Sequence, residues 1–262
     1  MERLEALTNY YTTHDEDVRL APKRGQVEFL TTVHYVEKYL KPGMRIIEIG
    51  AGTGRYSHYF ARNGYKVDAI ELMECNIEVF RANTNEFEDI SIQQGDAVCL
   101  QNIPSGVYDV TLLLGPMYHL YNKDDQISAL SEAIRVTKDG GVVFAAYCNN
   151  DSTVYNFGFV RGGFKAGTHD HLIDFETFKL SSTPKEVFTL HRREDVDDLM
   201  SNFSVERLHY IGTDMLTRFI GSTVDEMDDE TFDLYMKFNL AICERSDMVG
   251  ASNHVLDVFR KE

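Results

Sequence analysis

The chain has 262 residues, 43% of them hydrophobic, and a formal net charge of −16 at pH 7. This length suffices for one α/β domain with insertions, and we expect a single domain over residues 1–262. The acidic balance disfavours nucleic acid as a partner, because nucleic-acid binding relies on lysine and arginine. No stretch reaches the roughly 18 apolar residues that a membrane span requires, so we expect no membrane partner.

The four cysteines are Cys75, Cys99, Cys148 and Cys243, and they form no Cys-x-x-Cys pair. Such spacing predicts free thiols in a reducing compartment and no zinc site. The N-terminal stretch MERLEALTNYYTTHDED is charged and lacks the apolar segment of a signal peptide. We therefore expect a cytoplasmic protein.

Residues 1–40 are expected to form an N-terminal cap followed by a helix. The first 22 residues are polar and contain the pair Tyr10-Tyr11. From Val27 to Leu40 apolar residues recur in the pattern of a helix that packs on a sheet. Pro42-Gly43 ends this helix.

The sequence RIIEIGAGTGRYS at 45–57 is a short β-branched run that leads into three glycines at alternate positions. Gly50, Gly52 and Gly54 permit positive φ angles and carry no side chain, so the backbone can turn sharply and approach a ligand closely. A helix over 56–63 is expected to follow and to end at Gly64.

A dinucleotide-binding loop is the first alternative for this pattern. That loop needs its third glycine three residues after the second, where this chain has Arg55. Glu48 also precedes the loop, and a carboxylate would repel a pyrophosphate but attract a ligand with an amine and a sulfonium. Both observations favour a cationic nucleoside ligand.

The motif E-x-G-x-G-x-G after an apolar strand resembles motif I of the class I S-adenosylmethionine-dependent methyltransferases. The resemblance covers roughly residues 27–150 and implies that S-adenosylmethionine is the cofactor. It implies that the glycine loop holds the methionine moiety. The cofactor-binding residues that follow from it are Tyr11, Arg19, Glu48, Gly50, Ala51, Gly52, Glu71, Leu72, Asp96, Ala97, Leu114 and Gly115.

Two further acids stand at the ends of predicted strands. Glu71 ends a strand over 66–72, and an acid there can accept two hydrogen bonds from a ribose diol. Asp96 follows a strand that begins at Ile90, where family members often bind the adenine amino group. The alternatives are a capping or solvent-facing carboxylate for Glu71 and a helix N-cap for Asp96. Between the two strands we expect a helix over 76–87.

A nearly continuous apolar run, 110–114, predicts a central parallel strand that stops at Gly115-Pro116. His119 follows in the loop that lines the substrate side in this family, and it is our candidate general base. The alternative is that His119 makes hydrogen bonds within the turn and supports the helix after it.

The remaining elements complete the predicted sheet. A helix over 128–136 precedes a fifth strand over 142–147, a helix over 191–202 precedes a sixth strand over 203–212, and NHVLDVFRK forms a seventh. We expect a doubly wound, Rossmann-like α/β fold with a seven-stranded, mostly parallel sheet, helices on both faces and an inserted lid.

Two inserts, residues 151–190 and 213–247, are expected to form this substrate lid. The first is rich in phenylalanine without a sustained period, and the alternative is a purely structural insert. The second contains a solvated acidic run and a helix whose inner side is predicted to hold Phe232, Tyr235, Phe238, Ala241 and Ile242. His169 and His171 lack companion ligands, so we expect no metal.

These observations predict a methyltransferase that acts on oxygen or nitrogen of a small molecule. Tyr11 is expected to cover the methionine end of the cofactor, and Arg19 to meet its carboxylate. Two alternatives remain: a non-catalytic S-adenosylmethionine-binding module and a nicotinamide-dependent oxidoreductase. The acceptor and the oligomeric state stay open.

Overall fold

The computed structural model describes residues 2–14, 18–167 and 171–262. Within these residues the main sheet has eight strands in the order β3-β2-β1-β4-β5-β10-β9, with β8 paired to β5. The strands are β1 (Arg45–Ile49), β2 (Lys66–Glu71), β3 (Ile90–Gln94), β4 (Tyr108–Leu113), β5 (Thr137–Asn149), β8 (Leu190–His191), β9 (Val205–Gly212) and β10 (His254–Lys261). The predicted fold class is confirmed, and the two-residue β8 accounts for the strand beyond the seven expected.

All strand pairs of this sheet are parallel except those of β10, which runs antiparallel to both β5 and β9. Because β10 lies between these two strands, both of its edges are hydrogen-bonded, and its side chains pack into the cores on both faces of the sheet. Its burial is continuous from Val255 to Phe259. The start of β10 consequently lies beside the carboxyl end of β5, where His254 pairs with Cys148.

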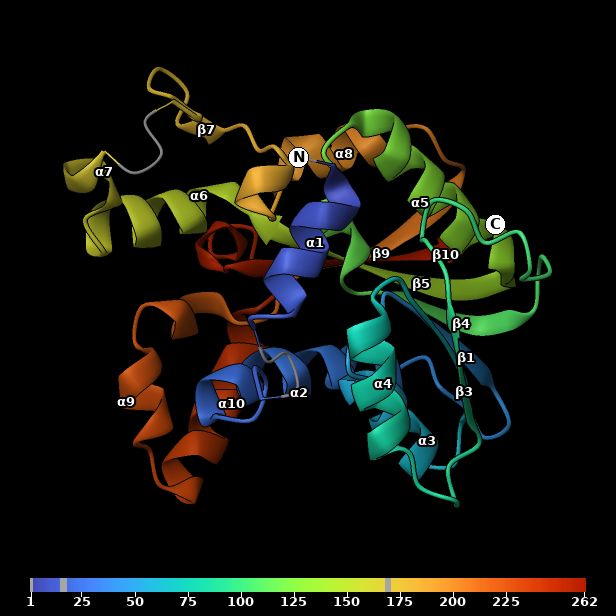
Figure 1. The fold of residues 1–262 in the computed structure, drawn as a ribbon. Coiled ribbons are helices and arrows are strands. Elements are labelled where there is room, and N and C mark those ends of the chain that lie inside the picture. Colours follow the sequence, from blue (N-terminus) through green and yellow to red (C-terminus); the bar gives the residue numbers. More distant parts are fainter. Residues whose placement is uncertain (1, 15–17, 168–170) are drawn as a thin grey trace.

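Helices cover both faces of the sheet (Figure 1). One face packs on α2 (Lys23–Glu37), α3 (Arg55–Arg62) and α4 (Glu74–Asn83), and the other on α5 (Lys123–Val136) and α8 (Arg193–Met200). The alternation of β1 divides its side chains between these layers, because Ile46 joins the first core and Ile47 and Ile49 the second. All three are fully buried.

Residues 3–11 form a helix, α1 (Arg3–Tyr11), which the sequence analysis treated only as part of a polar cap. Ala6 and Leu7 are its buried residues, so the helix has too narrow an apolar face to show a clear period. Figure 1 shows α1 passing in front of the strands, between the layer of α2 and α4 and the end of the molecule that carries α8.

The first insert is more regular than its sequence suggested. A helical segment runs through α6 (Asn150–Thr153) and a π-helix (η2, Val154–Val160), and α7 (Gly163–Ala166) follows it. Figure 1 shows this segment projecting from the sheet. The sequence of this segment shows no helical period, because Phe157 and Phe159 are 42% and 59% exposed and occupy the outer face where polar residues are usual. Beyond it come the hairpin of β6 (Ile173–Asp174) and β7 (Lys179–Leu180) and the short helix η3 (Pro184–Glu186).

The second insert contains η4 (Met215–Arg218), α9 (Gly221–Asp225) and α10 (Asp229–Ile242), and η5 (Val249–Ala251) follows it. The predicted inner side of α10 is partly wrong, since Phe238 is 53% exposed and Ala241 is exposed. The buried residues of α10 are Phe232, Met236 and Asn239. The side chain of Asn239 donates a hydrogen bond to the hydroxyl of Thr31 on α2 at 2.9 Å. The buried face of α10 thus includes a polar contact with α2.

The predictions on membrane spans, cysteines and metal ligands concern features spread along the chain. In the parts that the structure describes, no helix is both long and apolar enough to cross a membrane. All four cysteines are free, and Cys148 and Cys243 are buried. His169 lies outside the described residues, and His171 is exposed.

Candidate active site

The glycine loop connects β1 to α3 and is fixed against two neighbouring elements. The amides of Gly50 and Ala51 both donate to the carbonyl of Ile70, at 2.8 and 2.9 Å. Gly50 has φ +77°, and a Cβ there would lie 2.5 Å from Pro116 Cδ at the start of η1 (Pro116–His119). Gly52 has φ +55°, and a Cβ there would meet nothing within 4 Å. The loop is therefore tightly packed at Gly50, where it contacts Pro116, and has free space for a ligand at Gly52.

Glu71, at the end of β2, binds this loop directly. Its carboxylate accepts hydrogen bonds from the Gly52 amide at 2.8 Å, the Met73 amide at 2.9 Å and the Asn76 side chain at 3.2 Å. The residue is 5% exposed, and burial raises the pKa of its carboxyl despite these donors. The second predicted acid thus points toward the loop.

Glu48 lies beneath the loop and is 2% exposed. Its carboxyl accepts a hydrogen bond from the hydroxyl of Ser57 on α3. Burial raises the pKa of Glu48 to about 8, because its ionised form loses the solvation of water. Glu48 is consequently protonated at neutral pH until a cationic group approaches it.

Asp96 is covered by α1. Both of its carboxylate oxygens accept from the guanidinium of Arg3, at 3.0 and 3.2 Å. The neighbouring Ala97 is 5% exposed. An ion pair from the N-terminal helix therefore occupies the acid that the resemblance assigns to adenine.

His119 has both ring nitrogens engaged. Nδ1 donates to the carbonyl of Val187 at 2.9 Å, so Nε2 accepts from the hydroxyl of Tyr11 at 2.9 Å. His119 is 6% exposed, and burial lowers the pKa of its ring to about 4. The ring is neutral and joins α1 to the segment before β8.

A cavity of about 910 Å³ opens above the loop. Eight predicted site residues line it: Tyr11, Arg19, Glu48, Gly50, Ala51, Gly52, Leu114 and Gly115. Five others, Glu71, Leu72, Asp96, Ala97 and His119, are not among its lining residues. Both inserts contribute to the remaining wall, through residues such as Phe157, Phe164 and Thr217.

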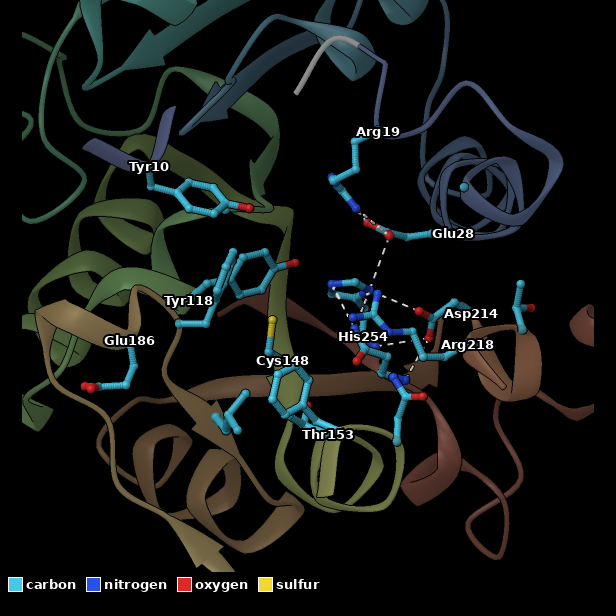
Figure 2. Close-up of a pocket in the computed structure, with 18 of the residues that line it drawn as sticks. Tyr10, Arg19, Glu28, Tyr118, Cys148, Thr153, Glu186, Asp214, Arg218 and His254 are labelled. Atoms are coloured by element: carbon cyan, nitrogen blue, oxygen red, sulfur yellow. Dashed lines mark hydrogen bonds and ion pairs between the residues drawn. The ribbon is translucent and has the colours of Figure 1, made fainter. Parts of the chain in front are cut away.

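An ion-pair cluster in this wall was missed by the sequence analysis. His254 Nδ1 lies 3.1 Å from a carboxylate oxygen of Asp214 and 3.2 Å from one of Glu28. Arg19 in turn donates to both oxygens of Glu28, at 2.9 and 3.2 Å. Figure 2 shows this Arg19-Glu28-His254-Asp214 cluster along one side of the cavity, with Tyr118 and Cys148 next to His254.

The cluster carries its own counter-charges. Although burial opposes a charge on the ring, the carboxylates of Glu28 and Asp214 hold the pKa of His254 well above its ordinary value. The possible metal-ligand atoms of Glu28, Asp214 and His254 lie within 4.8 Å of one another, a spacing at which they could bind a metal ion. Because Arg19 and the protonated His254 already supply positive charge, the cluster is better described as an ion-pair network.

The comparisons with known proteins agree with this geometry. A family model described as "Methyltransferase domain" matches residues 46–141, which contain the glycine loop, Glu71 and Asp96. Over this segment the chain matches a methyltransferase domain, in agreement with the class I S-adenosylmethionine-dependent family that its glycine motif resembles.

Two curated members of the family are partial relatives. The chain is 31% identical to a demethylmenaquinone methyltransferase of Renibacterium salmoninarum over 105 residues, which are 40% of this chain and 41% of that protein. It is 29% identical to a ubiquinone biosynthesis O-methyltransferase of Maricaulis maris over 133 residues, 48% of this chain and 51% of that one. The chain thus spans about half or less of the length of these relatives.

Among solved structures, a methyltransferase of Thermotoga maritima described as a possible histamine N-methyltransferase has the same fold. The TM-score is 0.61 with 18% identity, and the match covers 100% of both chains. At this identity the similarity concerns the fold alone.

The cofactor of this methyltransferase family is S-adenosylmethionine, and the loop region of this chain fits it. The space above Gly52 leaves room for a ligand, and the buried Glu48 lines that space without a cationic partner in the described part of the chain. A ligand with an ammonium and a sulfonium would supply the missing positive charge. On the nucleoside side, Glu71 and Asp96 are already bonded to Gly52 and Arg3.

No local pattern in the sequence pointed to the His254 cluster. Glu28 lies on α2, Asp214 follows β9 and His254 starts β10. These positions are far apart in the chain and meet only because β10 runs antiparallel beside β5. A single sequence offers no spacing rule for such a group.

Proposed function

We propose that the chain is an enzyme that transfers a methyl group from S-adenosylmethionine to an oxygen or nitrogen atom of a small molecule. One observation carries this proposal: Glu48 and the loop at Gly52 line the same cavity as Tyr118 and His254. We assign the acceptor to the side of Tyr118 and His254, so that the methyl donor and the acceptor share one space. The Maricaulis maris relative is described as an O-methyltransferase, which supports oxygen as the acceptor atom.

The cofactor-holding roles follow from the residues around the loop. We assign Glu48 to the ammonium group, Glu71 to the ribose diol and Asp96 to the adenine amino group. Asp96 takes this role once Arg3 releases it. Tyr11 and Arg19, which line the cavity, are assigned to the methionine end. When bound, the cofactor supplies an electrophilic methyl group on a sulfonium.

The chain's own contribution to the reaction is orientation and exclusion of water. In-line displacement needs the acceptor atom held on the axis of the breaking bond, and a dry site strengthens every charge interaction that holds it there. We assign this task to the inserts 151–190 and 213–247, whose side chains line the cavity. The ring of His119 is neutral, and both of its nitrogens are hydrogen-bonded within the protein. This arrangement favours a structural role for His119 over that of a general base.

Two further features support the proposal. The four free cysteines favour a reducing, cytoplasmic compartment. The net charge of −16 favours a small acceptor over nucleic acid.

Cofactor binding is tested with a pair of glycine variants and isothermal titration calorimetry. Gly52→Ala and Gly43→Ala both place a side chain at positive φ in open space, at +55° and +85°. Gly43 precedes the amino end of β1, whereas the glycine loop follows the carboxyl end. We expect wild type and Gly43→Ala to bind S-adenosylhomocysteine with similar affinity and Gly52→Ala to bind at least tenfold more weakly. Absence of binding to the wild type would refute the proposal.

Catalysis is tested with a metabolite extract and a methyl-labelled donor. Incorporation of label into a small molecule supports the enzyme. Tight binding of S-adenosylhomocysteine without any labelled product would identify a non-catalytic binding module instead. Protection against thermal unfolding by NAD, and not by S-adenosylhomocysteine, would favour an oxidoreductase.

A further inference from the structure

The cavity collects positive charge in a protein that is strongly acidic. The chain has a net charge of −16. Six basic residues nevertheless line this one cavity: Arg19, Arg24, Arg55, Arg161, Lys185 and Arg218. Such a concentration of one sign raises the local concentration of ligands of the opposite sign. The question is whether the acids of the same wall neutralise it.

The four carboxyl groups of the wall have partners or carry no charge. Glu28 and Asp214 are paired within the His254 cluster. Glu186 accepts from the Thr183 amide at 2.8 Å and caps its own short helix. Glu48 is protonated at neutral pH, because burial raises its pKa to about 8. Of these four groups, only Glu186 keeps an uncompensated negative charge, because its hydrogen-bond donors are neutral.

Three of the six basic residues have neither a carboxylate nor an aromatic partner among the residues that the structure describes. Arg19 is paired with Glu28 and Arg24 with Asp225, and Arg55 lies over the ring of Phe29. Among the residues that the structure describes, no carboxylate lies within ion-pair distance of Arg161, Lys185 or Arg218. They come from three segments, after η2, in η3 and at the end of η4.

Arg218 is the best placed of the three. Figure 2 shows it on the side of the cavity that holds Asp214 and His254, opposite Glu186. Its neighbour Asp214 is buried and bonded to His254, Ser252 and two backbone amides, so it is not available as a counter-ion for Arg218. The guanidinium is exposed to the cavity instead.

Apolar side chains fill the wall between these basic groups. They include Val154, Phe157, Phe164, Leu172, Leu180 and Phe219. A ligand that satisfies both kinds of surface has an apolar body and an anionic group. Guanidinium groups bind carboxylate and phosphate oxygens in a bidentate manner.

We propose that the methyl acceptor is an organic anion with an apolar body, whose carboxylate or phosphate is bound by Arg218 with Arg161 and Lys185. This inference rests on the proposed function, since it names the class of acceptor for the same cavity. It also assigns Arg218 as a specificity-determining residue. The cofactor's own carboxylate is left to Arg19.

The test uses matched ligand pairs and calorimetry, with and without saturating S-adenosylhomocysteine. The probes are octanoate with octanamide, phenylacetate with phenylacetamide, and phenyl phosphate with phenol. In the wild type we expect at least one anion to bind tenfold or more tightly than its neutral counterpart. The carboxylate and phosphate pairs distinguish the two anionic groups.

Arginine variants complete the test. In Arg218→Gln the preference for the anion should fall to threefold or less, and Arg161→Gln and Lys185→Gln should each reduce it. Lys237→Gln is the matched control, because Lys237 is exposed on α10 and does not line the cavity. Its preference should equal that of the wild type.

Several results would overturn the inference. The first is equal binding of the anion and its neutral partner, and the second is no binding of any anion at millimolar concentration. The third is a preference that persists when Arg161→Gln, Lys185→Gln and Arg218→Gln are combined in one variant. A loss of S-adenosylhomocysteine affinity in Arg218→Gln would assign this arginine to the cofactor instead. If the wild type binds no S-adenosylhomocysteine, the proposed function fails, while the titrations without it still decide the anion preference.

Discussion

The carboxylate of Glu71 accepts a hydrogen bond from the amide of Gly52 at 2.8 Å. The acid at the end of β2 is thereby tied to the loop that follows β1. Since β1 and β2 are adjacent parallel strands, their carboxyl ends meet at the same edge of the sheet. Any ligand that touches the loop also lies close to Glu71.

Replacement of this acid should weaken cofactor binding. Glu71→Ala removes a charged acceptor from Gly52, Met73 and Asn76, and hydrogen bonds to charged groups contribute about 1.5–3 kcal/mol each. We expect the Kd for S-adenosylhomocysteine to rise about 10- to 100-fold in calorimetric titration. Glu74→Ala is the control, because Glu74 is an exposed residue paired with Arg81 on the outside of α4. Equal affinities for the two variants would contradict the role of Glu71.

Glu48 should release a proton when the cofactor binds. Its pKa is about 8 in the free protein, so the carboxyl is protonated at pH 6.5 and a cationic ligand favours its ionised form. Affinity for S-adenosylmethionine should therefore rise with pH up to about 8, by at most about tenfold per unit. Calorimetry in buffers of different ionisation enthalpy measures this proton. Glu48→Gln should bind without releasing it, and an unchanged release in that variant would point to another group.

The pair between Arg3 and Asp96 should slow the entry of the cofactor. The guanidinium holds both carboxylate oxygens that we assign to adenine, and the two side chains are 23% and 32% exposed. A partly exposed pair of this kind is worth about 0.5–1 kcal/mol after screening by solvent. Arg3→Gln should accelerate association about two- to fivefold in stopped-flow measurements. Glu5→Gln, an exposed change on the same helix, should have no effect, and slower association in Arg3→Gln would be the opposite result.

The buried ring of His119 should make the protein sensitive to acid. The folded pKa of about 4 lies below the ordinary value of 6.5, so the unfolded chain binds the proton first as the pH falls. Stability from this group is complete above pH 6.5 and is lost between pH 6.5 and 4, by at most about 3 kcal/mol. Urea denaturation at pH 7.5 and 4.5 should show a smaller acid-induced loss in His119→Gln.

The exposed His14 provides the control, and His14→Gln should behave as the wild type does. The same variants also address the sequence-based hypothesis of a general base. If His119→Gln abolished labelled methyl transfer without changing the urea midpoint at pH 7.5, the base would be supported and the supporting role rejected.

Loss of His254 should destabilise the fold most at low and neutral pH. The raised pKa of this ring means that its contribution is complete below its ordinary pKa of 6.5 and disappears as the pH rises through the folded value. His254→Gln leaves the carboxylates of Glu28 and Asp214 without the proton between them, and breaking such a buried pair costs about 3–5 kcal/mol. Urea denaturation at pH 6.5 and 10 should show a larger difference from the wild type at pH 6.5.

The local features of the site could be predicted from the sequence because each is encoded in a few adjacent residues. The β-branched run Ile46-Ile47 predicts a buried strand. The glycines after it allow the positive φ angles that the loop adopts. Parallel strands then bring Glu71 to the same edge. This logic needs no knowledge of distant contacts.

Features that depend on distant contacts were not predictable in the same way. α1 has only two buried residues, so its helical period is too weak to read. On α10 the interior position at Asn239 is polar and depends on Thr31 of another helix, which led the apolar pattern to favour Phe238 wrongly. The His254 cluster needs three segments to meet, and no one of them has a motif.

The antiparallel course of β10 has a consequence for how the molecule assembles. β9 has no other partner than β10 within the described sheet, and β10 in turn lies against β5. Docking of this one strand thus fixes the edge of the sheet and delivers His254 to the cavity in the same event. Assembly of the fold and formation of the acceptor pocket should therefore be one cooperative transition, so that partly folded chains have no working pocket.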